Sequence, residues 1–150
     1  MNTESAIEGG ISGATTLTIL HEIVRQLDKN APRMDEIGMQ ALTKVFKKIN
    51  VDVPEKDMLY LLTTVLELIT NGVFYSLVGA GNKENVWLRG SVLGLAAGIG
   101  AVVLPDKLGL DDRATNRTGE TKFLTIVWYL IGGIVAAAVT QKIAERKENN

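Results

Sequence analysis

The charged residues of this 150-residue chain are strongly segregated, and three long segments carry almost none. Residues 58–79 contain one charged residue, Glu67, and residues 123–140 contain none. Residues 87–104 contain only Arg89, and we expect Pro105 to end this segment and residues 105–122 to form an exposed loop. A helix needs about 20 mostly apolar residues to cross the ~30 Å hydrocarbon core of a bilayer. The three segments therefore predict membrane-spanning helices, although the mean hydropathy of the whole chain is only +0.14.

A fourth span is predicted over residues 7–27, but this segment is more polar than the others. Its uncharged part, residues 9–20, is too short to cross a bilayer alone. Extension to residue 27 gives the required length and adds His21, Glu22 and Arg25. We expect a spanning helix whose last turns are polar. A helix that ends at the membrane interface is the alternative.

Residues 34–49 have a different pattern, that of an amphipathic helix. Apolar residues recur there with the helical period, while Lys44, Lys47 and Lys48 lie off the apolar stripe. A helix of this length and charge is predicted to lie on the membrane surface, or equally to pack on other parts of the protein. The predicted fold is thus all-α: a single helical membrane domain over residues 1–150, with about four spans and one interfacial helix.

The distribution of Lys and Arg predicts the orientation of the chain. Seven of the sixteen lie in residues 25–56 and four in residues 107–122, which share one side in a four-span arrangement. The positive-inside rule places that side, and the amphipathic helix, in the cytoplasm. The expected location is the bacterial inner (plasma) membrane, crossed several times. The basic C-terminal tail on the opposite side argues against this orientation.

Small residues recur four apart in three of the predicted spans. This spacing lets helix backbones approach closely, either within one chain or between copies. The leading functional hypothesis is therefore a non-enzymatic membrane protein that binds the bilayer and associates with itself or with a membrane partner. The residues of these rows are Gly10 and Ala14, then Gly90, Gly94 and Gly98, and finally Gly132 and Ala136.

Polar residues within the predicted spans mark the candidate functional site, because ionisable groups are expensive inside a membrane. They are His21, Glu22, Arg25, Glu67 and Asn71. A rise of ~1.5 Å per residue puts His21 ~9 Å and Glu67 ~13 Å below the same membrane face, so the two could meet. Arg25 could reach Glu67 or Glu22. The cluster is interpreted either as an ion-pair network that fixes helix register, or as a proton or ion carrier or channel that uses Glu67.

Lipid headgroups are a third candidate ligand. Arg33 lies at the predicted membrane boundary, and together with Arg25 it could hold a phosphate. Lys44, Lys47 and Lys48 would add attraction to anionic lipid. A membrane enzyme that acts on headgroups, with His21 as its base, is the corresponding hypothesis. An ordinary solvated helix face would explain the same lysines.

Several classes of function are disfavoured. The net charge of −1 and the lack of a basic face argue against nucleic acid as a partner. The segment from His21 to Arg25 resembles a zinc-protease helix, but arginine cannot ligate zinc and the chain has no second histidine. We predict no metal, no cofactor and no complete catalytic set, so an enzyme is disfavoured.

Four short motifs resemble a group of small bacterial integral membrane proteins of uncharacterised activity. The likeness extends from about Gly9 to Ala138. It implies an inner-membrane setting and transfers no activity to any residue. The motifs are His21-Glu22 with Arg25, Ala31-Pro32-Arg33-Met34-Asp35 with Gly38, Asn71 with Tyr75-Ser76-Leu77-Val78-Gly79, and Trp87-Leu88-Arg89-Gly90.

Overall fold

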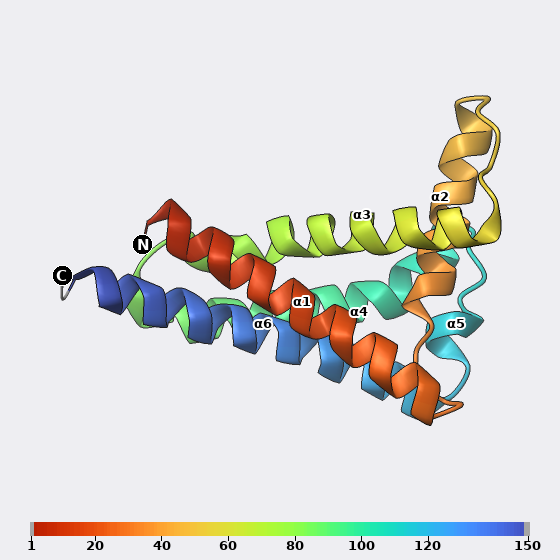
Figure 1. The fold of residues 1–150 in the computed structure, drawn as a ribbon. Coiled ribbons are helices and arrows are strands. Elements are labelled where there is room, and N and C mark those ends of the chain that lie inside the picture. Colours follow the sequence, from red (N-terminus) through yellow and green to blue (C-terminus); the bar gives the residue numbers. More distant parts are fainter. Residues whose placement is uncertain (1, 149–150) are drawn as a thin grey trace.

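The computed structural model describes residues 2–148, which form six α-helices and no strand (Figure 1). Four long helices run along the molecule, while α2 and α5 lie together at one end. The prediction of an all-α fold is confirmed. The elements are α1 (Thr3–Leu27), α2 (Met34–Lys48), α3 (Lys56–Ser76), the 3-10 turns η1 (Leu77–Gly79) and η2 (Lys83–Asn85), α4 (Val86–Lys107), α5 (Arg113–Asn116) and α6 (Gly119–Glu148).

The four long helices pack in the order α3, α1, α6, α4 rather than in chain order. Helix α1 packs between α3 and α6, α4 packs on the other side of α6, and α3 and α4 share few contacts. Both chain ends lie at one end of the bundle with the α3–α4 hairpin, and α2 and α5 lie at the other (Figure 1). We call these the hairpin end and the α2 end.

Glycines allow α4 and α6 to touch backbone to backbone. A Cβ atom added to Gly90 would lie 2.5 Å from the carbonyl oxygen of Gly133, and one on Gly94 would lie 2.8 Å from that of Tyr129. Helix α1 meets α3 in the same way, since a Cβ on Gly10 would lie 2.3 Å from the carbonyl oxygen of Gly72. The small-residue rows therefore lie at helix contacts within one chain.

The remaining small residues surround a tyrosine that ties α3 to α6. Ala14 and Ala136 are fully buried. A Cβ on Gly132 would lie 2.7 Å from the hydroxyl oxygen of Tyr75, so only a glycine leaves room for this ring. The Tyr75 hydroxyl donates a 2.7 Å hydrogen bond to the carbonyl oxygen of Tyr129. This bond satisfies a polar group in the middle of the bundle.

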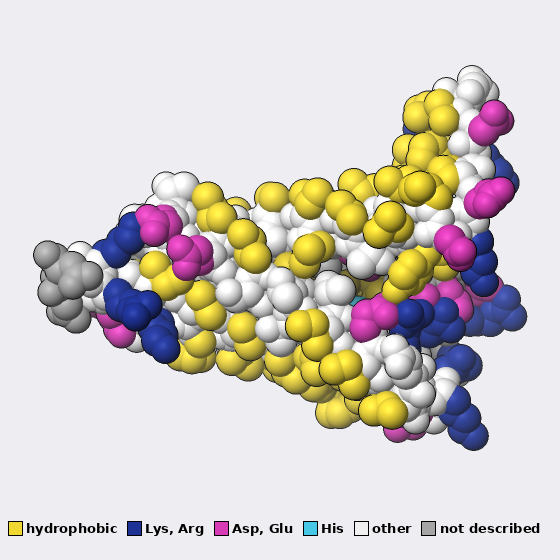
Figure 2. Space-filling view, in the orientation of Figure 1, with side chains coloured by type: hydrophobic (Ala, Val, Ile, Leu, Met, Phe, Trp, Pro, Cys, Tyr) yellow, Lys and Arg dark blue, Asp and Glu magenta, His cyan; other side chains and the backbone are white. Residues whose placement is uncertain are grey.

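Three helical segments are long and apolar enough to cross a membrane: Lys56–Gly79, Lys83–Lys107 and Gly119–Lys147. Helix α1 has the length but not the composition. The prediction of four spans is thus supported for three, and the first span stays a prediction. Figure 2 shows hydrophobic side chains along the flanks of the bundle and charged side chains gathered towards its two ends.

The predicted end of the third span at Pro105 is wrong, because α4 continues to Lys107. Proline removes one helical hydrogen bond, because its nitrogen carries no hydrogen. The next amide still closes that turn, since the N–H of Leu108 donates to the carbonyl oxygens of Leu104 at 2.9 Å and Pro105 at 3.2 Å. The segment after it, predicted as a loop, also contains the short helix α5.

Helix α2 projects sideways from the bundle, across the direction of the long helices (Figure 1). Its exposed residues include Val45 as well as Lys47 and Lys48. In Figure 2 the hydrophobic side chains of this arm face back along the bundle and its charged side chains face outwards. The predicted amphipathic helix over residues 34–49 is confirmed as a helix, one residue shorter.

Candidate functional site

An ion-pair network joins α1, α2 and α3 at the α2 end. Its centre is Arg25, in the last turn of α1, whose Nη2 atom donates to Glu22 Oε2 at 2.7 Å and to the Tyr60 hydroxyl at 3.1 Å. The Tyr60 hydroxyl donates in turn to Glu22 Oε1 at 2.6 Å. On its other side, Arg25 Nη1 lies 3.3 Å from Asp35 Oδ2. Arg25 therefore pairs with Glu22 and not with Glu67.

The first turn of α2 continues this network. Arg33 holds both carboxylate oxygens of Asp35, with its Nε at 2.9 Å and its Nη2 at 2.7 Å, and its Nη1 lies 3.0 Å from Glu36. Burial of Asp35 disfavours its charged form. The hydrogen bonds and charge of Arg33, together with the charge of Arg25, outweigh that effect and hold the pKa of Asp35 below its ordinary value. Arg25 and Arg33 therefore both form ion pairs with carboxylates.

Beneath the network lies a small polar cavity of about 20 Å³. Its volume is that of roughly one water molecule. The cavity is where α1, α2 and α3 bring titratable side chains together. Its lining residues are Thr18, His21, Glu22, Arg25, Pro32, Asp35, Thr64 and Glu67.

His21 enters this polar cavity from α1 with its ring against two aromatic residues of α6. The ring centroid lies 5.1 Å from that of Trp128 and 6.0 Å from that of Tyr129. Its Nε2 atom is buried and has no hydrogen-bond partner. The hydroxyl oxygen of Thr63 on α3 is likewise buried without a partner. A buried polar atom without a partner costs about 1–3 kcal/mol. The Nε2 atom of His21 lies beside the polar cavity, and its lack of a partner indicates room for a small polar ligand there.

Glu67 enters the polar cavity from α3, next to the backbone of α2. Gly38 makes room for it, because a Cβ there would lie 2.4 Å from Glu67 Oε1. Within residues 2–148, neither a hydrogen bond nor an ion pair reaches this carboxylate. The sequence prediction that His21 and Glu67 meet across α1 and α3 agrees with this shared cavity. Among the described residues, Glu67 differs from the other acids of the cluster in forming no ion pair.

Asn71 lies apart from this cavity. It lines a second, apolar groove together with Phe74 and Tyr129. The predicted polar cluster is therefore divided: four of its five members line the polar cavity and Asn71 does not.

The predicted headgroup residues lie in different settings. Arg33 is bound to acids, whereas Lys47 and Lys48 are exposed. Lys44 Nζ donates to the carbonyl oxygens of Leu108 at 2.9 Å and Gly109 at 2.7 Å, which ties α2 to the end of α4. Sequence reasoning missed two network members, Asp35 and Tyr60, because their contacts with Arg25 join different helices.

Comparisons with protein-family models, curated proteins and solved structures find no match to the chain. The resemblance to small bacterial membrane proteins therefore stays a prediction. Among residues 2–148, no group of three or more His, Asp or Glu side chains could hold a metal ion.

Proposed function

We propose that the protein is a four-span membrane protein that carries protons by way of Glu67 and His21 in the polar cavity. The fourth span would be α1. Its outer face is a row of exposed residues four apart in which only Thr15 is polar. The row consists of Ile7, Ile11, Thr15, Ile19, Ile23 and Leu27. This row extends over 20 residues, about 30 Å of helix, which matches the hydrocarbon core.

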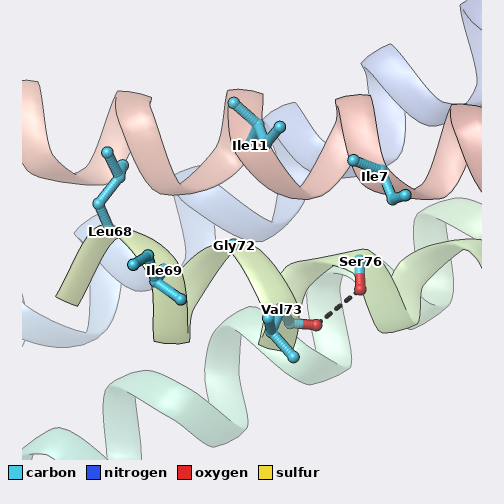
Figure 3. A pocket seen from close by; sticks show the side chains of 7 residues that line it. All are labelled: Ile7, Ile11, Leu68, Ile69, Gly72, Val73 and Ser76. Atoms are coloured by element: carbon cyan, nitrogen blue, oxygen red, sulfur yellow. Dashed lines mark hydrogen bonds between the residues drawn. The ribbon is translucent and has the colours of Figure 1, made fainter. Parts of the chain in front are cut away.

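The neighbouring surface supports the same placement of α1. Figure 3 shows Ile7 and Ile11 of α1 beside Leu68, Ile69 and Val73 of α3, with no charged side chain among the residues that line this surface. His21 and Arg25 of α1 point elsewhere, since His21 lies against α6 and Arg25 binds residues of α2 and α3. Lipid would therefore meet apolar side chains along most of α1.

The α2 end is proposed to face the cytoplasm. Eleven of the sixteen Lys and Arg residues lie in the segments that form this end, as the positive-inside rule requires of the cytoplasmic side. Helix α2 would then lie in the interface, with its apolar face on the lipid and its lysines towards water.

The observation that carries the proton hypothesis is the missing counter-ion of Glu67. A carboxylate at membrane depth needs a positive charge or a proton to be neutral. Arg25 and Arg33 are committed to other acids, which leaves a proton or an added cation. The cavity of about 20 Å³ has no room for a hydrated metal ion. A proton, passed through a single water, fits the space.

The geometry favours a carrier rather than an open channel. On the cytoplasmic side a proton would reach the cavity through Glu22, whose side chain is 35% exposed. Towards the hairpin end the bundle is closed by Ala14, Leu17 and Tyr75, which are buried. Onward transfer from His21 would require these helices to shift. In such a cycle, the polar cavity would be accessible first from one side of the membrane and then from the other.

The competing hypotheses receive less support. Self-association was motivated by small-residue rows that lie at contacts within the chain, so an oligomer or a membrane partner stays a prediction. A headgroup enzyme would need His21 at the surface, but its Nε2 atom is buried beside Trp128. The polar cavity is therefore better suited to protons than to lipid substrates.

Proton flux tests the proposal directly. The purified protein is reconstituted in liposomes that contain a pH-sensitive dye, and a potassium diffusion potential drives proton entry. We expect a flux above that of empty liposomes, abolished in Glu67→Gln because the amide cannot titrate. Glu8→Gln is the matched control, since Glu8 is an exposed acid of α1 far along the chain from the cavity.

Two outcomes would contradict the proposal. One is the absence of flux with the unmodified protein under any driving gradient. The other is an equal flux from Glu67→Gln and Glu8→Gln. Infrared difference spectra provide a second readout, because a protonated carboxyl absorbs separately from a carboxylate. We expect a pH-dependent carboxyl band that disappears in Glu67→Gln.

A further inference from the structure

A second cavity opens where α3 and α4 fail to pack on each other. It is an apolar groove of about 540 Å³, within the ~300–1,000 Å³ typical of ligand sites. Its walls come from α3 and α4, and Tyr129 of α6 also lines it. Helix α2 closes the cytoplasmic end with Met34, Ile37 and Ala41. We call this the α3–α4 groove.

The α3–α4 groove lies at hydrocarbon depth. Both of its long walls belong to segments that could span a membrane. It extends along α4 from Ala96 to Leu104, about 12 Å of helix, and on to Leu108 at the membrane boundary. Its lining is almost entirely apolar, with Thr70 and Asn71 as exceptions. Water is therefore not the natural occupant of this space.

The cytoplasmic rim of the groove carries positive charge. Lys44 of α2 donates to the carbonyl oxygens of Leu108 and Gly109, and Leu108 lines the groove. An ammonium group has three donors, so one remains for a further acceptor. Lys107 is 71% exposed nearby in sequence, with Asp106 at 4.0 Å as its partner. A phosphate at this rim would find the free donor of Lys44, and Lys107 is the neighbour in sequence of Leu108, which lines the groove.

We propose that the α3–α4 groove holds one acyl chain of an anionic phospholipid, with the lipid phosphate at Lys44 and Lys107. A transmembrane helix fits less well. It is about 10 Å wide with its side chains, and if it followed the groove to the membrane surface it would meet α2. A single flexible chain can enter below α2 and place its headgroup at the lysines. This proposal does not depend on proton transport.

Lipid retention after purification tests the proposal. The unmodified protein, purified in mild detergent, should keep a phospholipid that native mass spectrometry detects. Ala101→Phe adds a ring inside the groove and should release it. Val103→Phe is the matched control, because it adds the same ring to an exposed position of α4 that does not line the groove. Ala97→Leu makes a smaller addition to the groove and serves if Ala101→Phe does not fold.

Headgroup selectivity is tested with Lys44→Gln. Competition between phosphatidylglycerol and phosphatidylcholine vesicles should show a preference for the anionic lipid that falls about fivefold in this variant, the contribution of one lysine at an anionic surface. Equal lipid retention in Ala101→Phe and Val103→Phe would overturn the acyl-chain site. An oligomer that Ala101→Phe disrupts, with lipid retention unchanged, would show a second copy in the groove instead. An unchanged preference in Lys44→Gln would overturn the phosphate assignment.

Discussion

Gly94 lies where α4 meets the backbone of α6, and its substitution by alanine should destabilise the bundle measurably. The added Cβ would lie 2.8 Å from both Leu130 Cα and the carbonyl oxygen of Tyr129. Ordinary Cβ contacts begin near 3.4 Å, and backbone atoms cannot rotate away. The two helices must therefore separate, and overpacking of this kind costs about 1–3 kcal/mol.

Gly100 on the same helix is the matched control. A Cβ there meets only Leu104 Cδ1, at 3.5 Å, an ordinary contact with a flexible side chain. Both variants gain the same ~1 kcal/mol of helix propensity, so this term cancels in their difference. We expect Gly94→Ala to be less stable than Gly100→Ala by about 1–3 kcal/mol, at roughly 2–4 °C of melting temperature per kcal/mol. Thermal unfolding of both variants in one detergent measures this difference. Equal melting temperatures would refute the close approach of α4 and α6.

Two further predictions concern the ion-pair network. Asp35→Asn should cost roughly 1–3 kcal/mol at neutral pH, less than the ~3–5 kcal/mol of a fully buried pair because Arg25 and Arg33 are partly exposed. Since the pKa of Asp35 is lowered from about 3.8, its stabilisation is complete above that pH and is lost as the pH falls through the lower folded value. Melting curves of the unmodified protein should therefore show an acid loss that Asp35→Asn lacks, and parallel curves would contradict the pairing. Tyr60→Phe removes the hydroxyl that bridges Glu22 and Arg25 and should cost about 1–2 kcal/mol in the same assay. Its proton flux should be retained, because Glu22 keeps its carboxylate and Tyr60 does not line the polar cavity. A lost flux would show that the Tyr60 hydroxyl takes part in proton entry at Glu22.

The sequence predicted the helices well because their signals are local. The helical period gave residues 34–49, and the uncharged runs gave the first two apolar spans to within a few residues. The run over residues 123–140 found the last span but missed both ends of α6, which extends from Gly119 to Glu148. The error at Pro105 has a physical reason: a proline in the last turn costs one hydrogen bond and need not end a helix. Four-residue rows of small side chains also predicted close packing, though not which helices would meet.

The candidate site was only partly predictable, because its pairings are tertiary. Glu22 and Arg25 are three apart on one helix, so their ion pair could be expected from spacing alone. The bonds of Arg25 to Asp35 and Tyr60 depend on how α2 and α3 pack on α1. Asn71 was grouped with Glu67 because both lie on α3, but a separation of four residues did not bring it into the same cavity.

For helix α1, the low hydropathy of its sequence and its central position in the bundle point in different directions. It has the weakest membrane signature of the four long helices, yet it packs between two of them. In the proposed four-span arrangement only the outer face of α1 would meet lipid, and that face is the row that includes Ile7, Ile19 and Ile23. Its inner face can then carry polar groups, provided that neighbouring helices supply their partners. Arg25 has such partners, whereas Glu67, on the other side of the cavity from α1, has none among the described residues. The proton hypothesis is based on this difference.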